Sequence, residues 1–73
     1  MNNPRSDLRA SPTLYQHVRA DFVRRGLTLN AWCRANGVTH GNARKALIGE
    51  WTGPKASVLV ARIVAASRGR DAA

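Results

Sequence analysis

The side chains in this sequence that could take part in covalent or metal chemistry are few and poorly spaced for it. Cys33 is the one cysteine, and its place on the apolar side of a predicted helix indicates a small buried side chain, not a nucleophile. His17 and Asp21 are four residues apart, which suits a hydrogen-bonded pair on one helix face, but no third catalytic group lies near them. His17 and His40 fall on different predicted helices without an acidic cluster, which disfavours a metal site. We therefore expect no enzyme activity, no metal and no cofactor.

The other feature of the sequence that indicates a function is its positive charge. The 73 residues include 12 Lys or Arg against 4 Asp or Glu, a formal net charge of +8. Such a surface attracts polyanions, and nucleic acid is the polyanion that we favour. A chain of this length holds one small domain, with little room to enclose a small-molecule substrate. No apolar run of about eighteen residues predicts a membrane span, and no signal peptide is evident, so we expect a cytoplasmic protein, associated with the nucleoid of a bacterial host.

Four short helices must position these charges, and capping signals mark where each of them begins. Ser11-Pro12, Thr28 and Thr39 are typical helix starts, and Pro54 suits a first helical turn. No alternating strand pattern interrupts them, so the expected fold is all-α, a compact bundle that contains a helix-turn-helix. The expected helices span about residues 12–25, 29–36, 40–48 and 54–67.

The domain organisation follows from the same pattern. Residues 1–10 are polar and are expected to form a flexible arm, residues 11–68 the domain, and residues 69–73 a frayed tail. Arg5 and Arg9 of the arm could enter a DNA minor groove, as basic arms do. A solubilising tail is the interpretation that we favour for them.

The predicted helix over residues 40–48 has small apolar residues on one side and cations on the other. Gly41, Arg44 and Lys45 fall within an arc of about 100° that faces away from the alanines. Arg44 can form two hydrogen bonds to guanine, worth roughly 1–3 kcal/mol of discrimination, and Lys45 can bind a base or a phosphate. Asn42 could pair with adenine, and His40 could reach a base edge or a phosphate. These five residues are the candidate base readers.

Gly41 admits two interpretations, because Gly inside a helix costs about 1 kcal/mol relative to Ala. It could allow a close approach to DNA. Alternatively, the helix starts at Asn42 and leaves His40 and Gly41 in the turn. The sequence leaves both open, and in either case Arg44 and Lys45 are helical and exposed.

Phosphate groups favour helix N-termini, where unpaired N–H groups and the helix dipole attract anions. Thr28 and Thr39 each precede a helix, and we expect both to cap it. Gly53 and Lys55 flank the start of the fourth helix. The candidate phosphate-binding residues are therefore Thr28, Thr39, Gly53 and Lys55.

The segment TLNAWCRANGVTHGNARKAL, residues 28–47, resembles the helix-turn-helix of the lambda repressor/Cro-like (XRE-type) family, most like the small Ner-type regulators of transposable phages. The matching positions are the small residue four before the turn glycine, that glycine, the apolar residue after it and two buried positions of the recognition helix: Cys33, Gly37, Val38, Ala43 and Ala46. The sequence departs from the family in having Cys at 33 where Ala is usual and Ala at 43 where a branched residue is commoner. The resemblance runs from about Leu14 to Arg68. It implies a transcriptional regulator, phage or mobile-element derived, that inserts its third helix into the major groove. Such a regulator acts as a repressor or assists a transposition or lysogeny decision.

The predicted fourth helix is apolar over an arc of about 160°, wider than the 100° or so that one packing face needs. Val60 and Val64 on this arc are the candidates for self-association. A homodimer on double-stranded DNA is expected, since one small module usually needs a second half-site for tight binding. The same face supports an alternative function, a protein-interaction adaptor or an architectural DNA-binding protein.

Overall fold

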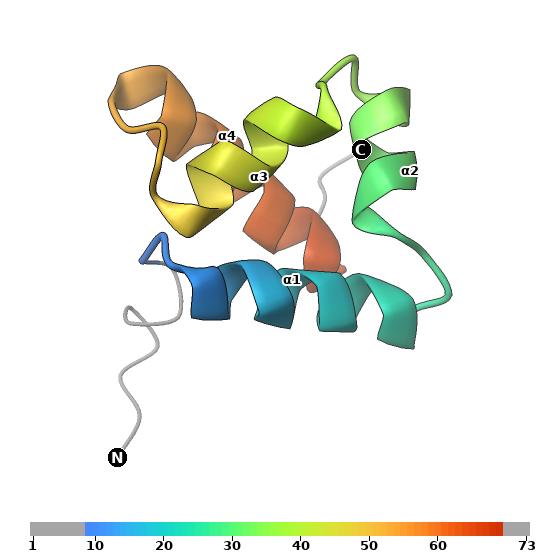
Figure 1. Ribbon diagram of the computed structural model, residues 1–73. Helices are drawn as coiled ribbons and strands as arrows, with labels where there is room; N and C mark the ends of the chain where they lie inside the picture. Colours follow the sequence, from blue (N-terminus) through green and yellow to red (C-terminus); the bar gives the residue numbers. More distant parts are fainter. Residues whose placement is uncertain (1–8, 70–73) are drawn as a thin grey trace.

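The computed structural model describes residues 9–69, and these form four helices and no strand (Figure 1). The helices are α1 (Pro12–Arg24), α2 (Leu29–Ala35), α3 (His40–Ile48) and α4 (Pro54–Ser67). The predicted all-α fold is confirmed. α1 and α2 end at Arg24 and Ala35, where residues 25 and 36 were expected. Predictions about residues 1–8 and 70–73, the residue Arg5 among them, lie outside the described residues.

Capping explains where these helices begin. The side-chain oxygens of Ser11, Thr28 and Thr39 each accept a hydrogen bond from the backbone N–H three residues later, at 3.0, 3.0 and 3.2 Å. α4 begins at Pro54, which has no N–H to leave without a partner. Because Thr39 is the cap, α3 starts at His40 and Gly41 lies in its first turn. The interpretation that started this helix at Asn42 is wrong.

A tight turn over residues 36–39 joins α2 to α3. Gly37 adopts a left-handed backbone conformation, with φ at 69°, which a residue with a side chain rarely takes. The backbone N–H of Val38 then donates to the carbonyl oxygen of Cys33 at 2.9 Å, closing the end of α2. Val38 itself packs against the core. α2 and α3 therefore form a helix-turn-helix unit anchored to the rest of the domain.

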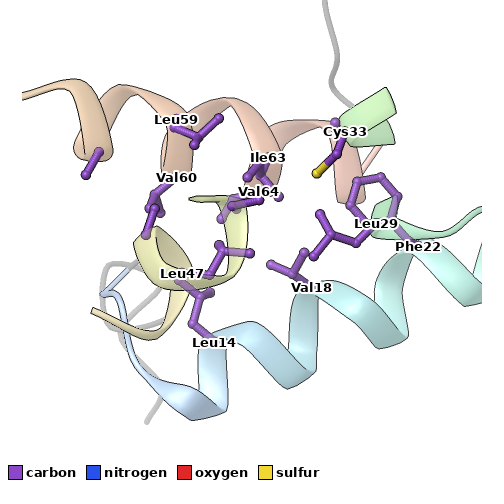
Figure 2. Close-up of a cluster of buried hydrophobic side chains, with 14 residues drawn as sticks. Leu14, Val18, Phe22, Leu29, Cys33, Leu47, Leu59, Val60, Ile63 and Val64 are labelled. Atoms are coloured by element: carbon purple, nitrogen blue, oxygen red, sulfur yellow. The ribbon is translucent and has the colours of Figure 1, made fainter. Parts of the chain in front are cut away.

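The core lies where α1, α3 and α4 meet. Leu47 of α3 and Ile63 of α4 have no exposed surface, and Phe22 of α1 is 1% exposed. Figure 2 shows side chains from α1 and α4 converging around Leu47, with Leu29 and Cys33 of α2 at one end of the cluster. The backbone N–H of Ser11 also donates to the Leu47 carbonyl oxygen at 2.8 Å, so the start of α1 is fixed to the end of α3.

The wide apolar arc of α4 is used within the domain. α4 packs against both α1 and α3, and Val60 and Val64 are only 8% and 4% exposed. The prediction that these two valines form an edge for self-association is therefore wrong, because both belong to the core of a single chain. The large apolar side chain that α4 leaves in solvent is Val58, at 60% exposure.

Candidate nucleic-acid interface

The outward side of α3 carries the predicted base readers. Gly41, Asn42, Arg44 and Lys45 are exposed and His40 is half-buried. At 3.6 residues per turn, Gly41 and Lys45 lie within about 30° of the direction opposite the buried side. Arg44 and Asn42 lie farther round, about 75–90° from it on opposite flanks. The helix therefore presents Lys45 at its centre and Arg44 along one edge.

The buried side of α3 explains why this helix holds a fixed position. Ala43 and Leu47 have no exposed surface, and Ala46 is 1% exposed. Small side chains at 43 and 46 let α3 lie close to its neighbours, since packing distance depends on the side chains at the contact. This packing directs the cationic side of α3 toward solvent.

Arg44 lies at the edge of α3 that faces α1, and its guanidinium group lies near an aromatic ring of α1. The Cζ atom of Arg44 lies 5.9 Å from the centre of the Tyr15 ring, and the Cζ atom of Arg19 lies 5.6 Å from the same centre. Cations at this distance are attracted to the ring, by about 0.5–1 kcal/mol at exposed sites. Tyr15 itself packs against the core. The structure therefore brings Arg19 and Arg44, from separate helices, to the same ring.

Sequence reasoning missed Tyr15 and Arg19 as members of this surface. Their spacing of four residues places them on one flank of α1, beside the buried side. That spacing was visible in the sequence. Which element covers this flank was not, because it depends on how α1 and α3 cross.

The cations on this surface have no acidic partner. Across residues 9–69 the ion pair is between Arg24 and Asp21 within α1, and it involves neither Arg19 nor Arg44 nor Lys45. The expected pair of His17 with Asp21 is not formed there, and the Asp21 carboxylate pairs with Arg24 instead. The charge on α3 and on the adjacent flank of α1 is thus available to an external anion.

The candidate phosphate-binding residues lie at the helix ends around α3. The hydroxyl oxygens of Thr28 and Thr39 accept the capping hydrogen bonds, which leaves each O–H able to donate to a phosphate. Gly53 and Lys55 are exposed at the start of α4. α2 and the N-terminal end of α4 lie on opposite sides of α3 in Figure 1. Arg9 is exposed just before α1.

A second contact holds the helix-turn-helix unit against α4. The guanidinium of Arg62 lies 5.4 Å from the centre of the Trp32 ring and donates from Nη2 to the Asn36 side-chain oxygen at 3.1 Å. The Asn36 amide group in turn donates to the Trp32 carbonyl oxygen at 2.9 Å. Arg62 is therefore engaged in bracing the turn that precedes α3.

Among the described residues, the side chains that could act as nucleophiles or metal ligands form no candidate site. Cys33 has no exposed surface, and burial raises the pKa of its thiol. Within residues 9–69 there is no group of three or more His, Cys, Asp or Glu side chains that could hold a metal ion. None of the helices in this range has both the length and the apolar character needed to cross a membrane.

No family model, curated protein or solved structure matches this chain. The resemblance to the lambda repressor/Cro-like family therefore stays a prediction, and the geometry around α3 is the basis for inferring function.

Proposed function

We propose that this protein is a sequence-specific double-stranded DNA-binding regulator of transcription that lays α3 in the major groove. The observation that supports this most directly is the two-sided character of α3. Arg44 and Lys45 project into solvent, whereas Ala43 and Leu47 on the other side have no exposed surface. The major groove, about 12 Å wide, admits one α-helix.

Each residue of the outward side has a role in this proposal. Lys45 and Arg44 supply donors for guanine edges or phosphates, and Asn42 can pair with an adenine edge. His40 reaches the DNA from the start of the helix. Gly41 has open space around it, with no atom from beyond its own turn of helix within 4 Å of the position that a Cβ would take, so the backbone can approach the DNA closely there.

Contacts to the phosphates of the DNA backbone fix the position of α3 along the groove. The O–H groups of Thr28 and Thr39 and the exposed start of α4, with Gly53 and Lys55, are the proposed phosphate contacts. Arg9, which is exposed just before α1, is the proposed minor-groove contact. A homodimer on two half-sites about one helical turn apart remains part of the proposal, but Val60 and Val64 are too buried to form its interface.

Titration of labelled duplex DNA at several salt concentrations tests the proposal. Binding is expected at low salt, and exchanging Arg44 and Lys45 together for Ala is expected to abolish most of it. A control that removes one positive charge away from α3 is Arg24→Ala, because Arg24 is an exposed residue that pairs with Asp21 and lies beside Ser67 and Arg68 at the far end of α4. Unchanged affinity in the α3 variant would show that α3 does not read the groove.

Selection of bound fragments from a random DNA pool separates this function from its alternative. A regulator that reads bases enriches a defined sequence, whereas an architectural protein gives a flat selection. The protein-interaction adaptor predicts no duplex binding that depends on Arg44 or Lys45. Light scattering with and without the enriched duplex then gives the oligomeric state on DNA.

A further inference from the structure

Arg19 and Arg44 are held at the same aromatic ring, although they come from different helices. Both guanidinium groups lie within 5.9 Å of the centre of the Tyr15 ring. Within residues 9–69 no carboxylate pairs with either of them. Both positive charges attract an anion that binds beside this ring.

Tyr15 adds a third group with affinity for phosphate. Its ring packs against the core, which holds the ring in place. Its hydroxyl makes no hydrogen bond within residues 9–69 and can donate to an external acceptor. Tyr hydroxyls and Arg side chains are both common donors to phosphate oxygens in protein–DNA complexes.

The position of this cluster relative to α3 indicates which part of the DNA it meets. Lys45 lies within about 30° of the outward direction of α3, whereas Arg44 lies about 75° away, at the edge toward α1. A groove has base edges at its floor and phosphates along its walls. A side chain at the centre of the helix therefore points toward the floor, and one at the edge points toward a wall.

We propose that Arg19, Tyr15 and Arg44 form a seat for the sugar–phosphate backbone of one DNA strand, which leaves base reading mainly to Lys45. This inference rests on the proposed function, since it places the strand beside α3. It divides the two cations of α3 by role: Arg44 contributes affinity that is independent of sequence, and Lys45 contributes discrimination between sequences.

The test compares four single-charge variants, Arg19→Gln, Arg44→Gln, Lys45→Gln and the control Arg24→Gln. Affinity is measured for the duplex enriched by selection and for an unrelated duplex of equal length, from about 50 to 200 mM salt. Each of the variants Arg19→Gln and Arg44→Gln is expected to lower the affinity for both duplexes by the same factor. Each should also make the slope of log affinity against log salt shallower by about 0.9.

The other two variants are expected to behave differently. Lys45→Gln should reduce the preference for the enriched duplex by about tenfold, since a good base contact is worth that much discrimination. Arg24→Gln should leave both the preference and the slope close to those of the wild-type protein. Tyr15→Phe removes only the hydroxyl and should cost less affinity than Tyr15→Leu, which also removes the ring, and thermal unfolding of each variant confirms that it is folded.

Two results would overturn the phosphate seat while leaving the proposed function intact. One is an Arg44→Gln protein that loses its preference for the enriched duplex at an unchanged salt slope. The other is an Arg19→Gln protein with the same slope as Arg24→Gln. If the wild-type protein binds every duplex equally, base reading fails, and the slopes on unrelated DNA still decide whether the seat exists. If it binds no duplex, both proposals fail.

Discussion

The guanidinium of Arg25 donates a hydrogen bond from Nη1 to the carbonyl oxygen of Ala66 at 2.6 Å, across 41 positions of sequence. Arg25 is the C-cap of α1. Ala66 lies in the last turn of α4, where the helix dipole places a partial negative charge. The contact joins the C-terminal ends of the first and last helices. Arg25 therefore links two helices, whereas Arg24 next to it pairs only with Asp21 of its own helix.

Replacing Arg25 by Met is expected to lower the free energy of unfolding by about 1 kcal/mol, because it removes a charged hydrogen bond to a helix end but keeps the aliphatic stem. Urea unfolding followed by far-UV circular dichroism measures this. Arg24→Met is the matched control, and its exposed pair with Asp21 is worth no more than about 0.5 kcal/mol. Equal losses in the two variants would contradict the role given to Arg25.

Gly41→Ala is expected to stabilise the domain and to weaken DNA binding. The added methyl group meets no atom from beyond its own turn of helix within 4 Å, and residue 41 lies in the first turn of α3. Ala is preferred to Gly in a helix by about 1 kcal/mol, so the melting temperature should rise. In the proposed complex the same methyl group faces the DNA, so affinity for the enriched duplex should fall.

Gly37→Ala is the contrasting variant, because residue 37 has a φ of 69°. Strain at this position should lower the melting temperature, although no atom blocks the methyl group. A Gly41→Ala protein that gains stability and binds DNA unchanged would show that Gly41 does not approach the DNA.

Burial of Cys33 predicts a loss of stability in alkaline solution. Its thiol pKa lies above the ordinary value of 9.0 in the folded chain because burial disfavours the thiolate. The native state therefore holds this proton more tightly than the unfolded state does. The resulting stability is fully present below pH 9.0 and is lost as the pH rises from there toward the folded pKa.

Urea unfolding of the wild-type protein and of Cys33→Ala at about pH 8 and about pH 10 isolates this effect from other titrating groups. The wild-type protein should lose more stability over this range than Cys33→Ala. Equal losses would mean that the thiol does not contribute to the pH dependence.

Thr39→Ala is expected to destabilise the domain by about 1 kcal/mol, since Thr39 Oγ1 accepts the hydrogen bond from the Asn42 backbone N–H at 3.2 Å. Thr39→Ser keeps the accepting hydroxyl and should retain most of the stability. Thermal unfolding of the three proteins gives the comparison. A Ser variant as unstable as the Ala variant would point to packing of the Thr methyl group in place of the cap.

The amino-acid sequence by itself determined the helices and the two sides of α3. Caps such as Thr28 and Thr39 act within three residues, and the period of 3.6 residues separates Ala43 from Lys45 without reference to the rest of the chain. Such signals are local, so they could be read before any tertiary contact was known. The candidate base readers were predicted for the same reason.

Only the tertiary structure decided what covers each helix flank. The crossing of α1 and α3 brings Tyr15 and Arg19 to Arg44, and the packing of α4 against two helices buries Val60 and Val64. Crossing angles depend on how the side chains of both helices interdigitate, which no single segment specifies. For that reason the sequence predicted a cationic helix correctly, but it could neither find the arginine on α1 that accompanies it nor exclude the valines from the surface.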